Sequence, residues 1–360
     1  MCPYYYCRKC GAELDETARF CPVCGTPVAT APPATTQPTR TTQKRRLIYV
    51  LPVIILAAVL LSALVLGVLF FLPLNPAHFN QTNKVPQTAM DNLFLDLQVD
   101  VGKVNIFFED LPGDVAVLNV TADGSVRVFE DASHPVNVTF SHEAANNSDM
   151  VIARVTRTSR WPVSFGLNVK CDVYIDPSAN VTLQVRSTVG NIAMDTDANA
   201  KVTLHRIDFE TTTGNINVNL PKDTVISRSV SLQTTTGHVQ FIMDEADVSG
   251  DISVNLQSTT GAVNADLTAT QRLSGNVTVN ARSTTGSVNL DMTIDGNIGA
   301  RIESDTNLGQ IKLDVTRFSG NESPIQSNNY PAGSNFLVNL NSDTGGINIH
   351  AAYGSTSVQI

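Results

Sequence analysis

Hydrophobic and polar residues alternate along most of the chain after about residue 91, and the alternation occurs in repeated segments. This part is rich in Val, Ile, Thr, Asn and Gly, and its period of two is typical of β-strands. A segment of the form Thr-Thr-Gly-x-Val/Ile-x-Val/Leu recurs at intervals of 23 to 25 residues, with one final gap of 36. Its glycines are Gly190, Gly214, Gly237, Gly261, Gly286, Gly309 and Gly345.

Each repeat predicts two strands and two corners. The second and fourth residues after each glycine are apolar and face a core, whereas the third is mostly polar and faces water. Glycine suits the corner because it adopts positive φ without steric cost, and threonine suits the strand before it. The sequence therefore predicts a mainly β protein with a stacked-β solenoid over 188–360, since a fixed period is typical of solenoids. The alternative fold is a β-sandwich, which also has evenly spaced short strands. In the solenoid, residues 91–187 would form the first coils or a cap over the open sheet edge.

A second pattern is an uninterrupted apolar segment. Residues 47–73 contain no charge, and about 20 helical residues suffice to cross a bilayer, so this segment predicts one transmembrane helix. It is too long and begins too late for a cleaved signal peptide. Lys44, Arg45 and Arg46 precede it, which predicts a cytoplasmic N-terminus and an extracytoplasmic C-terminal domain. Residues 28–46 are expected to form a disordered linker, and 74–90 a polar stalk.

Cysteines are concentrated in the first 24 residues. Two Cys-x-x-Cys-Gly segments place Cys7, Cys10, Cys21 and Cys24 at the spacing of a structural zinc site with four thiolates. Such a site leaves no open position for a substrate, and metal binding would supply folding energy to the unit at 1–27. Phe20 is expected to act as its apolar plug. Cys171 is the only cysteine after the apolar segment, so no disulfide can form within the outer domain.

Charge and composition narrow the possible functions. Seven of the 24 Lys/Arg and three of the 33 Asp/Glu precede the apolar segment, so the domain after it is acidic and not suited to nucleic acid. The six histidines are scattered, and no catalytic constellation or phosphate-binding loop occurs. Asn-x-Ser/Thr sequons all follow the apolar segment, where glycosylation would be topologically possible. They begin at Asn80, Asn119, Asn137, Asn146, Asn180, Asn276 and Asn321.

One column of acidic residues is a candidate cation site. Asp266, Asp291 and Asp314 occupy the fifth position after their repeat glycines. If successive coils stack, these carboxylates lie about 4.8 Å apart on an outward face and repel one another unless a cation such as calcium bridges them. The alternative is a solvated column without a metal, because calcium needs six to eight oxygen ligands.

Two family resemblances follow from these motifs. Residues 7–25 resemble the small zinc ribbon found at the N-terminus of many prokaryotic membrane proteins. The repeated Thr-Thr-Gly segments over 91–360 resemble the putative adhesin family of bacteria and archaea, which implies a β-solenoid-like fold of unknown function. Together they predict a non-enzymatic, membrane-anchored surface protein that binds an envelope protein or glycan. Alternatives are a sensor whose ribbon recruits a cytoplasmic protein, and a solenoid enzyme acting on polysaccharide.

Overall fold

The computed structural model describes residues 5–15, 18–28, 54–64, 74–87, 92–127, 131–145, 148–158, 166–196, 201–271 and 273–354. The chain divides into two compact units, Met1–Phe71 and Leu72–Ile360, and each is described by itself. All but the first residue of the predicted linker at 28–46 lies outside the described residues.

The first unit contains a small hairpin and a helical segment. Strands β1 (Tyr5–Tyr6) and β2 (Glu13–Leu14) pair antiparallel. Residues 54–64 are helical, and all of them are exposed. In the described part of the chain, no helix combines the length and apolar character needed to cross a membrane. The rest of the predicted span at 47–73 lies outside the described residues.

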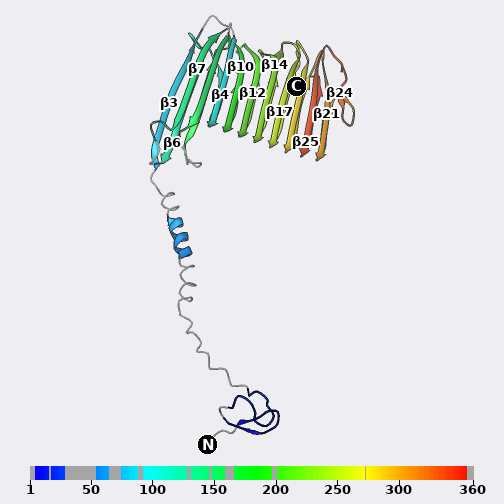
Figure 1. Ribbon diagram of the computed structural model, residues 1–360. Coiled ribbons are helices and arrows are strands. Elements are labelled where there is room, and N and C mark those ends of the chain that lie inside the picture. Colours follow the sequence, from blue (N-terminus) through cyan, green and yellow to red (C-terminus); the bar gives the residue numbers. More distant parts are fainter. Residues whose placement is uncertain are drawn as a thin grey trace. The chain divides into compact units, whose positions relative to one another are not determined.

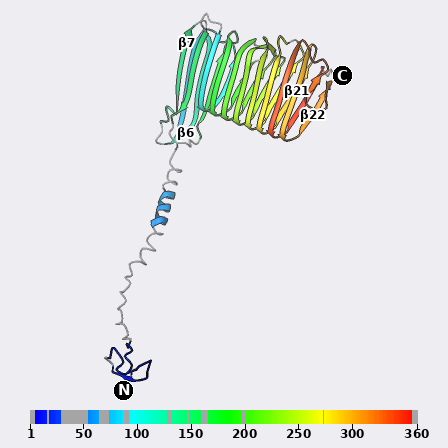
Figure 2. The same cartoon turned by 45° about the vertical axis from the view of Figure 1, so that its right-hand side comes forward.

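The second unit is built from two β-sheets whose middle strands stack as parallel coils (Figures 1 and 2). Each coil places one strand in a 13-stranded sheet and the next in an 11-stranded sheet. The central strands of the first sheet are β10 (Asn180–Val189), β12 (Val202–Thr213), β14 (Thr224–Thr236), β17 (Ile252–Thr260) and β19 (Val277–Thr285). Those of the second are β11 (Ile192–Asp195), β13 (Ile216–Leu220), β15 (Val239–Asp244), β18 (Val263–Ala269) and β20 (Val288–Ile294). The predicted mainly β, stacked arrangement is confirmed.

The core lies between the two sheets and follows the predicted columns. The second residues after the glycines, such as Ile216, Val239 and Val263, pair in register and are fully buried. Large aromatic side chains, among them Phe209 and Phe241, fill the space between the sheets. Burying a side chain of this size contributes roughly 1.5–3 kcal/mol, so the continuous apolar column stabilises the stack.

The repeat glycines form a column in which backbones approach very closely. A Cβ on Gly237 would lie 2.0 Å from the carbonyl oxygen of Gly214, and one on Gly261 would lie 1.9 Å from that of Gly237. Both glycines also have strongly positive φ, +147° and +142°. These two corners therefore require glycine for two reasons: its positive φ, and its lack of a side chain, which lets the neighbouring backbone approach.

A column of hydroxyls reinforces these corners. The residue three before each repeat glycine is Ser or Thr, and in six of the seven repeats its hydroxyl donates to the glycine carbonyl of a neighbouring coil. Ser258 Oγ donates to Gly237 O at 2.8 Å, and Ser283 Oγ donates to Gly261 O at 2.8 Å. The other donors are Thr211, Thr234, Thr306 and Ser342. The repeated Ser/Thr residue therefore has a structural role beyond β-propensity.

The coils do not stack in chain order at the C-terminal end. Strands β21 (Ile298–Leu308) and β22 (Ile311–Thr316) come before β25 (Ser334–Thr344) and β26 (Ile347–Tyr353) in the chain. In space, β25 pairs with both β19 and β21, and β26 pairs with both β20 and β22. The last coil is thus inserted between two earlier ones. The hairpin of β23 (Phe318–Ser319) and β24 (Ile325–Ser327) pairs with part of β21. In the middle of the domain, the short strand β16 (Asp247–Val248) pairs with β14.

The N-terminal end also departs from chain order. The coil of β4 (Asn92–Val101) and β5 (Lys103–Phe108) lies between the β10–β11 coil and that of β8 (Ser148–Arg157) and β9 (Asn168–Ile175). Antiparallel strands then end both sheets: β7 (Val136–Ala145), β6 (Asp114–Arg127) and β3 (Leu74–Pro86). Residues 91–187 therefore provide coils as well as a cap.

The expectation of a polar stalk at 74–90 is wrong for most of that segment. Leu74–Pro86 is β3, which pairs with β6 at the edge of the 11-stranded sheet. Ala77 and Val85 are buried, whereas most residues between them are polar and partly exposed. Pro76 and Pro86 are compatible with this position because an edge strand has one row of backbone groups without strand partners.

Candidate functional site

Four cysteines in the first unit come together as the sequence predicts. The Sγ atoms of Cys7, Cys10, Cys21 and Cys24 all lie within 4.8 Å of one another. The Cys7–Cys24 and Cys10–Cys21 sulfur pairs are each 3.6 Å apart. A zinc ion with Zn–S bonds of about 2.3 Å separates tetrahedral sulfurs by about 3.8 Å, so the four thiols fit zinc.

Two similar turns hold these cysteines. The Gly11 N–H donates to Cys7 O and the Gly25 N–H donates to Cys21 O, both at 2.9 Å. Both glycines have positive φ, as the tight turns require. At Cys24, a hydrogen bond with the Thr26 hydroxyl at 3.2 Å contributes most to lowering the pKa of the thiol to about 6. Interactions between the thiols raise the pKa of Cys10, however, so the fit to zinc rests on the positions of the four sulfurs.

The predicted role of Phe20 is wrong. Its side chain is exposed, and its backbone forms a β-bridge with Pro27. The buried cluster consists instead of Leu14 with Cys7 and Cys21, packed by Ala12, Cys24 and Val28. Leu14 takes this place because the β1–β2 hairpin turns it toward the sulfurs, a position that the cysteine spacing alone does not reveal.

The acidic column differs from the sequence prediction. Asp266 and Asp291 are direct neighbours on β18 and β20, but the inserted strand β26 places His350 between Asp291 and Asp314. His350 Nδ1 lies 3.6 Å from Asp314 Oδ2. Within the described residues, the cysteine cluster alone brings three or more ligand groups together for a metal. The structure therefore does not support calcium at Asp266, Asp291 and Asp314.

The outward asparagines have partners along the stack. Asn289 donates to Asn264 and Asn348 donates to Asn289, both at 2.7 Å, on the 11-stranded sheet. A second ladder joins Asn255, Asn280 and Asn339 on the other sheet, with bonds of 2.9 Å. These amides stabilise the stacking of coils, so their repetition needs no ligand to explain it.

An aromatic pair borders a hollow on the 11-stranded sheet. Phe107 of β5 and Tyr174 of β9 are paired in register, and their rings stack with centroids 5.4 Å apart and planes inclined by 23°. The hollow has a volume of about 670 Å³. Its further lining residues are Phe108, Glu109, Asp195, Thr196, Asn219 and Pro221. It therefore combines ring surface with carboxylate and amide groups.

The polar groups of this hollow are held in place. Asn219 Nδ2 donates to Asp195 Oδ1 at 2.9 Å, which keeps the Asp195 carboxylate on the surface of β11. Burial, assisted by the charge of Asp172, raises the pKa of Tyr174, so its phenol remains a neutral donor. The sequence analysis missed this site because Phe107 and Tyr174 are distant in the chain and outside the regular repeats.

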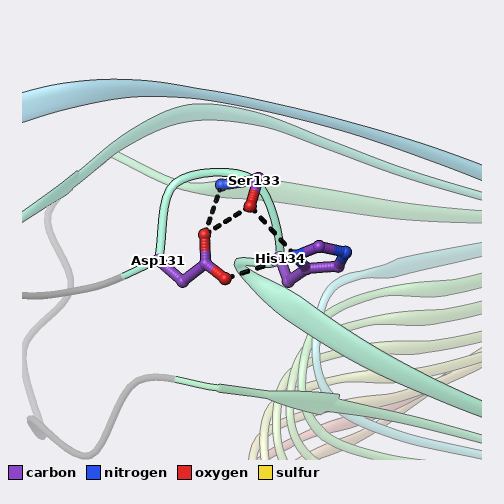
Figure 3. A network of polar contacts seen from close by, with 3 residues as sticks. All are labelled: Asp131, Ser133 and His134. Carbon is purple, nitrogen blue, oxygen red and sulfur yellow. Dashed lines mark hydrogen bonds and ion pairs between the residues drawn. The ribbon is translucent and has the colours of Figure 1, made fainter.

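A polar network in the β6–β7 connection has a structural explanation (Figure 3). Asp131 accepts hydrogen bonds from the N–H and hydroxyl of Ser133, and His134 Nδ1 lies 3.2 Å from its second oxygen. The Ser133 bonds are the main cause lowering the pKa of Asp131 to about 2. All three residues belong to one exposed turn, and the carboxylate binds the serine directly, so the contacts close a turn rather than activate a nucleophile.

The chain resembles solved structures only distantly. It is similar to a solved structure of a putative cell adhesion protein from Clostridium sporogenes, at 13% identity, with a TM-score of 0.36, covering 78% of this chain and 100% of that one. It is also similar to a putative adhesin from Bacteroides fragilis, at 10% identity, with a TM-score of 0.34, covering 76% and 97%. At these TM-scores the likeness supports no functional conclusion.

The curated proteins give no significant match. A zinc-ribbon domain family matches residues 6–28, which include all four clustered cysteines. The N-terminal residues of this chain are therefore a zinc-ribbon domain.

Proposed function

We propose that this protein is a membrane-anchored surface protein that binds a hydroxyl-rich polymer, such as an envelope glycan, on the outward face of its 11-stranded sheet. The observation that carries this proposal is the hollow beside the Phe107–Tyr174 pair. The apolar C–H face of a sugar ring packs on an aromatic ring, and sugar hydroxyls donate to carboxylates and amide oxygens. Glu109, Asp195 and Asn219 supply such acceptors beside the rings.

The charge of the hollow indicates which glycans it would accept. Among the described residues that line it, Glu109 and Asp195 are carboxylates and none is basic. A sulfated or otherwise anionic sugar would be repelled, whereas a neutral or amine-bearing sugar would not. We therefore expect neutral or amino-sugar oligomers to be the ligand class.

The proposed anchor is the apolar segment at 47–73, with the zinc ribbon in the cytoplasm. It is supported by the absence of charge in this segment and by the exposure of every residue in the helical part at 54–64. Exposed Leu, Ile and Val side chains on all sides of a helix are typical of a helix in lipid. Basic residues precede the segment, which supports the proposed orientation.

Binding can be tested on the full chain in detergent by isothermal titration with neutral, amino-sugar and sulfated hexasaccharides. We expect Phe107→Ala to weaken binding of the neutral or amino-sugar oligomer by about tenfold, in keeping with loss of a stacking contact. Phe94→Ala is the matched control, because Phe94 is a half-buried, outward aromatic residue on β4 of the other sheet. Absence of binding, or binding lost only in the Phe94 variant, would contradict the proposal.

The zinc site can be tested separately. We expect about one zinc per chain by elemental analysis, and loss of that zinc when Cys7 and Cys24 are both replaced by serine. A matched Cys171→Ser variant should keep the metal, since Cys171 is fully buried in β9 of the other unit. Retention of zinc by the double variant would show that these sulfurs are not its ligands.

A second candidate is a transmembrane sensor whose ribbon contacts a cytoplasmic protein. It is favoured by the exposed apolar side chains of Tyr6, Phe20 and Val23 on the ribbon. If these residues form a docking face, Phe20→Ala should abolish co-purification of a stoichiometric partner without loss of zinc. A partner that is retained equally by the variant would argue against a role for this face.

A further inference from the structure

Among the described residues, the 11-stranded sheet ends at β22, which has no strand on its outer side. Strand β22 has β26 on one side, and the strand order of the sheet stops there. The β23–β24 hairpin extends the other sheet beyond β21, with which it pairs at Arg301 and Ile302, but it does not pair with β22. At the opposite end, the two sheets end in the antiparallel strands β3 and β7. The C-terminal end differs because its edge strand, β22, belongs to a parallel coil.

Apolar side chains that would belong to the core remain uncovered at this end. Ile311, Leu313 and Val315 pair in register with Ile347, Ile349 and Ala351, which are buried. Ile311 nevertheless remains 39% exposed, and Leu313 and Val315 are partly exposed, because no further coil packs on them. Leu308, at the end of β21, is 70% exposed. An open edge with an unfinished core is a site for another strand.

The direction of the backbone groups favours such pairing. The N–H of Gly345 donates to Leu308 O and that of Ile347 donates to Gln310 O, so even-numbered residues direct their backbone groups toward the β26 coil. Backbone groups alternate along a strand, which turns those of Ile311, Leu313 and Val315 toward the open edge. The backbone N–H and C=O groups of these three odd-numbered residues can therefore hydrogen-bond to another strand.

We propose that the partner is a second copy of this chain, paired antiparallel through β22 about Leu313. In this register, Lys312 lies opposite the partner's Asp314, and by symmetry Asp314 lies opposite the partner's Lys312. Both side chains are exposed, and Lys312 makes no ion pair with the rest of the described chain. Ile311 meets the partner's Val315, and the two Leu313 side chains meet, so the apolar column continues across the interface.

This pairing is self-complementary in three independent respects. It matches opposite charges on the outward face, apolar residues on the inward face, and free backbone groups between them. A shift of one residue would direct charged side chains into the core. A two-fold axis through Leu313 therefore satisfies the condition that an isologous interface joins the same surface of both copies.

The interface would form at the end of the sheet opposite to β3, the first strand of the β-domain. Ten strands follow β22 in the order that ends at β3. At about 4.8 Å per strand, this places the two edges roughly 48 Å apart along the sheet. Self-association would thus join two β-domains at the ends remote from the point where each chain enters.

The test uses the full chain in detergent and two reciprocal charge variants. Asp314→Lys places lysines opposite lysines, and Lys312→Asp places aspartates opposite aspartates. By analytical ultracentrifugation we expect the wild type to dimerise reversibly and each variant alone to bind itself about tenfold more weakly. Lys201→Asp, at an exposed position away from β22, changes the net charge equally and should leave dimerisation unchanged.

Mixing the two variants distinguishes this interface from association through the apolar segment or from misfolding. A chain with lysine at both positions pairs correctly with a chain that has aspartate at both, so the mixture should form heterodimers at least as strongly as the wild type forms homodimers. A monomeric wild type would overturn the proposal. Equal weakening of dimerisation by the two β22 variants and by the Lys201 control would also overturn it. So would a mixture of the two β22 variants that forms no heterodimers.

Discussion

The middle of the β-domain and its C-terminal end are made from the same repeat but obey different stacking rules. From β12 to β20, each coil packs on the coil that precedes it in the chain. At the end, the coil of β25 and β26 packs on β19 and β20, and the earlier coil of β21 and β22 is displaced outward. The order of the coils along the chain therefore does not determine which coils stack together, when the side chains of two coils distant in the chain match better.

Two residues indicate what determines that order. Asn339 and Asn348 continue the two asparagine ladders from Asn280 and Asn289. At the same positions the displaced coil has Glu303 and Lys312, which cannot continue a ladder of amides. The coil with both asparagines occupies the inner place, and the charged coil lies at the edge. Outward amide ladders thus favour particular neighbours, and charges are tolerated in the edge coil, where one side faces solvent.

The largest contrast between these regions should come from the core. Phe241 and Leu313 occupy the same inward column, but Phe241 is fully buried and Leu313 is partly exposed. Phe241→Ala should cost about 3–5 kcal/mol because it leaves a cavity between closed sheets. Leu313→Ala should cost about 1 kcal/mol or less, since little area is uncovered. Urea unfolding followed by circular dichroism measures both, and equal losses would show that the end coil packs as tightly as the middle.

A smaller contrast concerns glycines. Gly237→Ala should destabilise the protein by about 3 kcal/mol, because its Cβ would meet the Gly214 carbonyl and its φ is unfavourable. Gly250 also has positive φ, +84°, but no atom lies within 4 Å of its added Cβ. Gly250→Ala should therefore cost only the backbone strain, about 1 kcal/mol. Urea unfolding measures the loss of stability in both glycine variants. Similar losses would mean that neighbouring coils can move apart at Gly237 without cost.

The sequence could predict the regular part of this fold because each repeat contains its own structural information. The apolar columns at Ile216, Val239 and Val263 follow from a period of two, and the glycine corners follow from their spacing. The four ribbon cysteines follow from a doubled motif in the same way. In each case local spacing determines which atoms meet.

The order of the coils could not be predicted from spacing, because stacking energies depend on pairs of coils that are distant in the chain. A signal was nevertheless present. The copy around Gly309 has Asn307 and Leu308 where four of the other six copies have two threonines, and it has Lys312 where most have asparagine or glutamine. Atypical copies are common at the ends of repeat arrays. The Phe107–Tyr174 pair carried no such signal, since its two strands differ in sequence and meet only in the folded domain.

The hydroxyl column gives a third, weaker comparison. Ser258 donates to the Gly237 carbonyl, so Ser258→Ala should cost about 1 kcal/mol. Ser187 occupies the same repeat position near the N-terminal end, but its buried hydroxyl has no hydrogen-bond partner. Ser187→Ala should be neutral or slightly stabilising, because it removes an unsatisfied polar group. Hydrogen–deuterium exchange at the two corners would show the difference, and equal protection in both variants would argue against a contribution from the ladder.

The smallest effect concerns the acidic column and depends on pH. Burial, with the charge of Asp291 as a further cause, raises the pKa of Asp266 above its ordinary value of 3.8. The folded state therefore binds this proton more tightly than the unfolded state, and ionisation costs stability as pH rises above the unfolded value. Asp266→Asn should raise the free energy of unfolding at pH 7 by up to about 1 kcal/mol, with the gain shrinking as pH falls below about 4. Asp314→Asn, at the exposed end beside His350, should give no such gain, because Asp314 has no acidic neighbour in register. Melting temperatures of both variants between pH 3 and pH 7 measure this difference, and a gain at Asp266 that persists unchanged at pH 3 would exclude the electrostatic explanation.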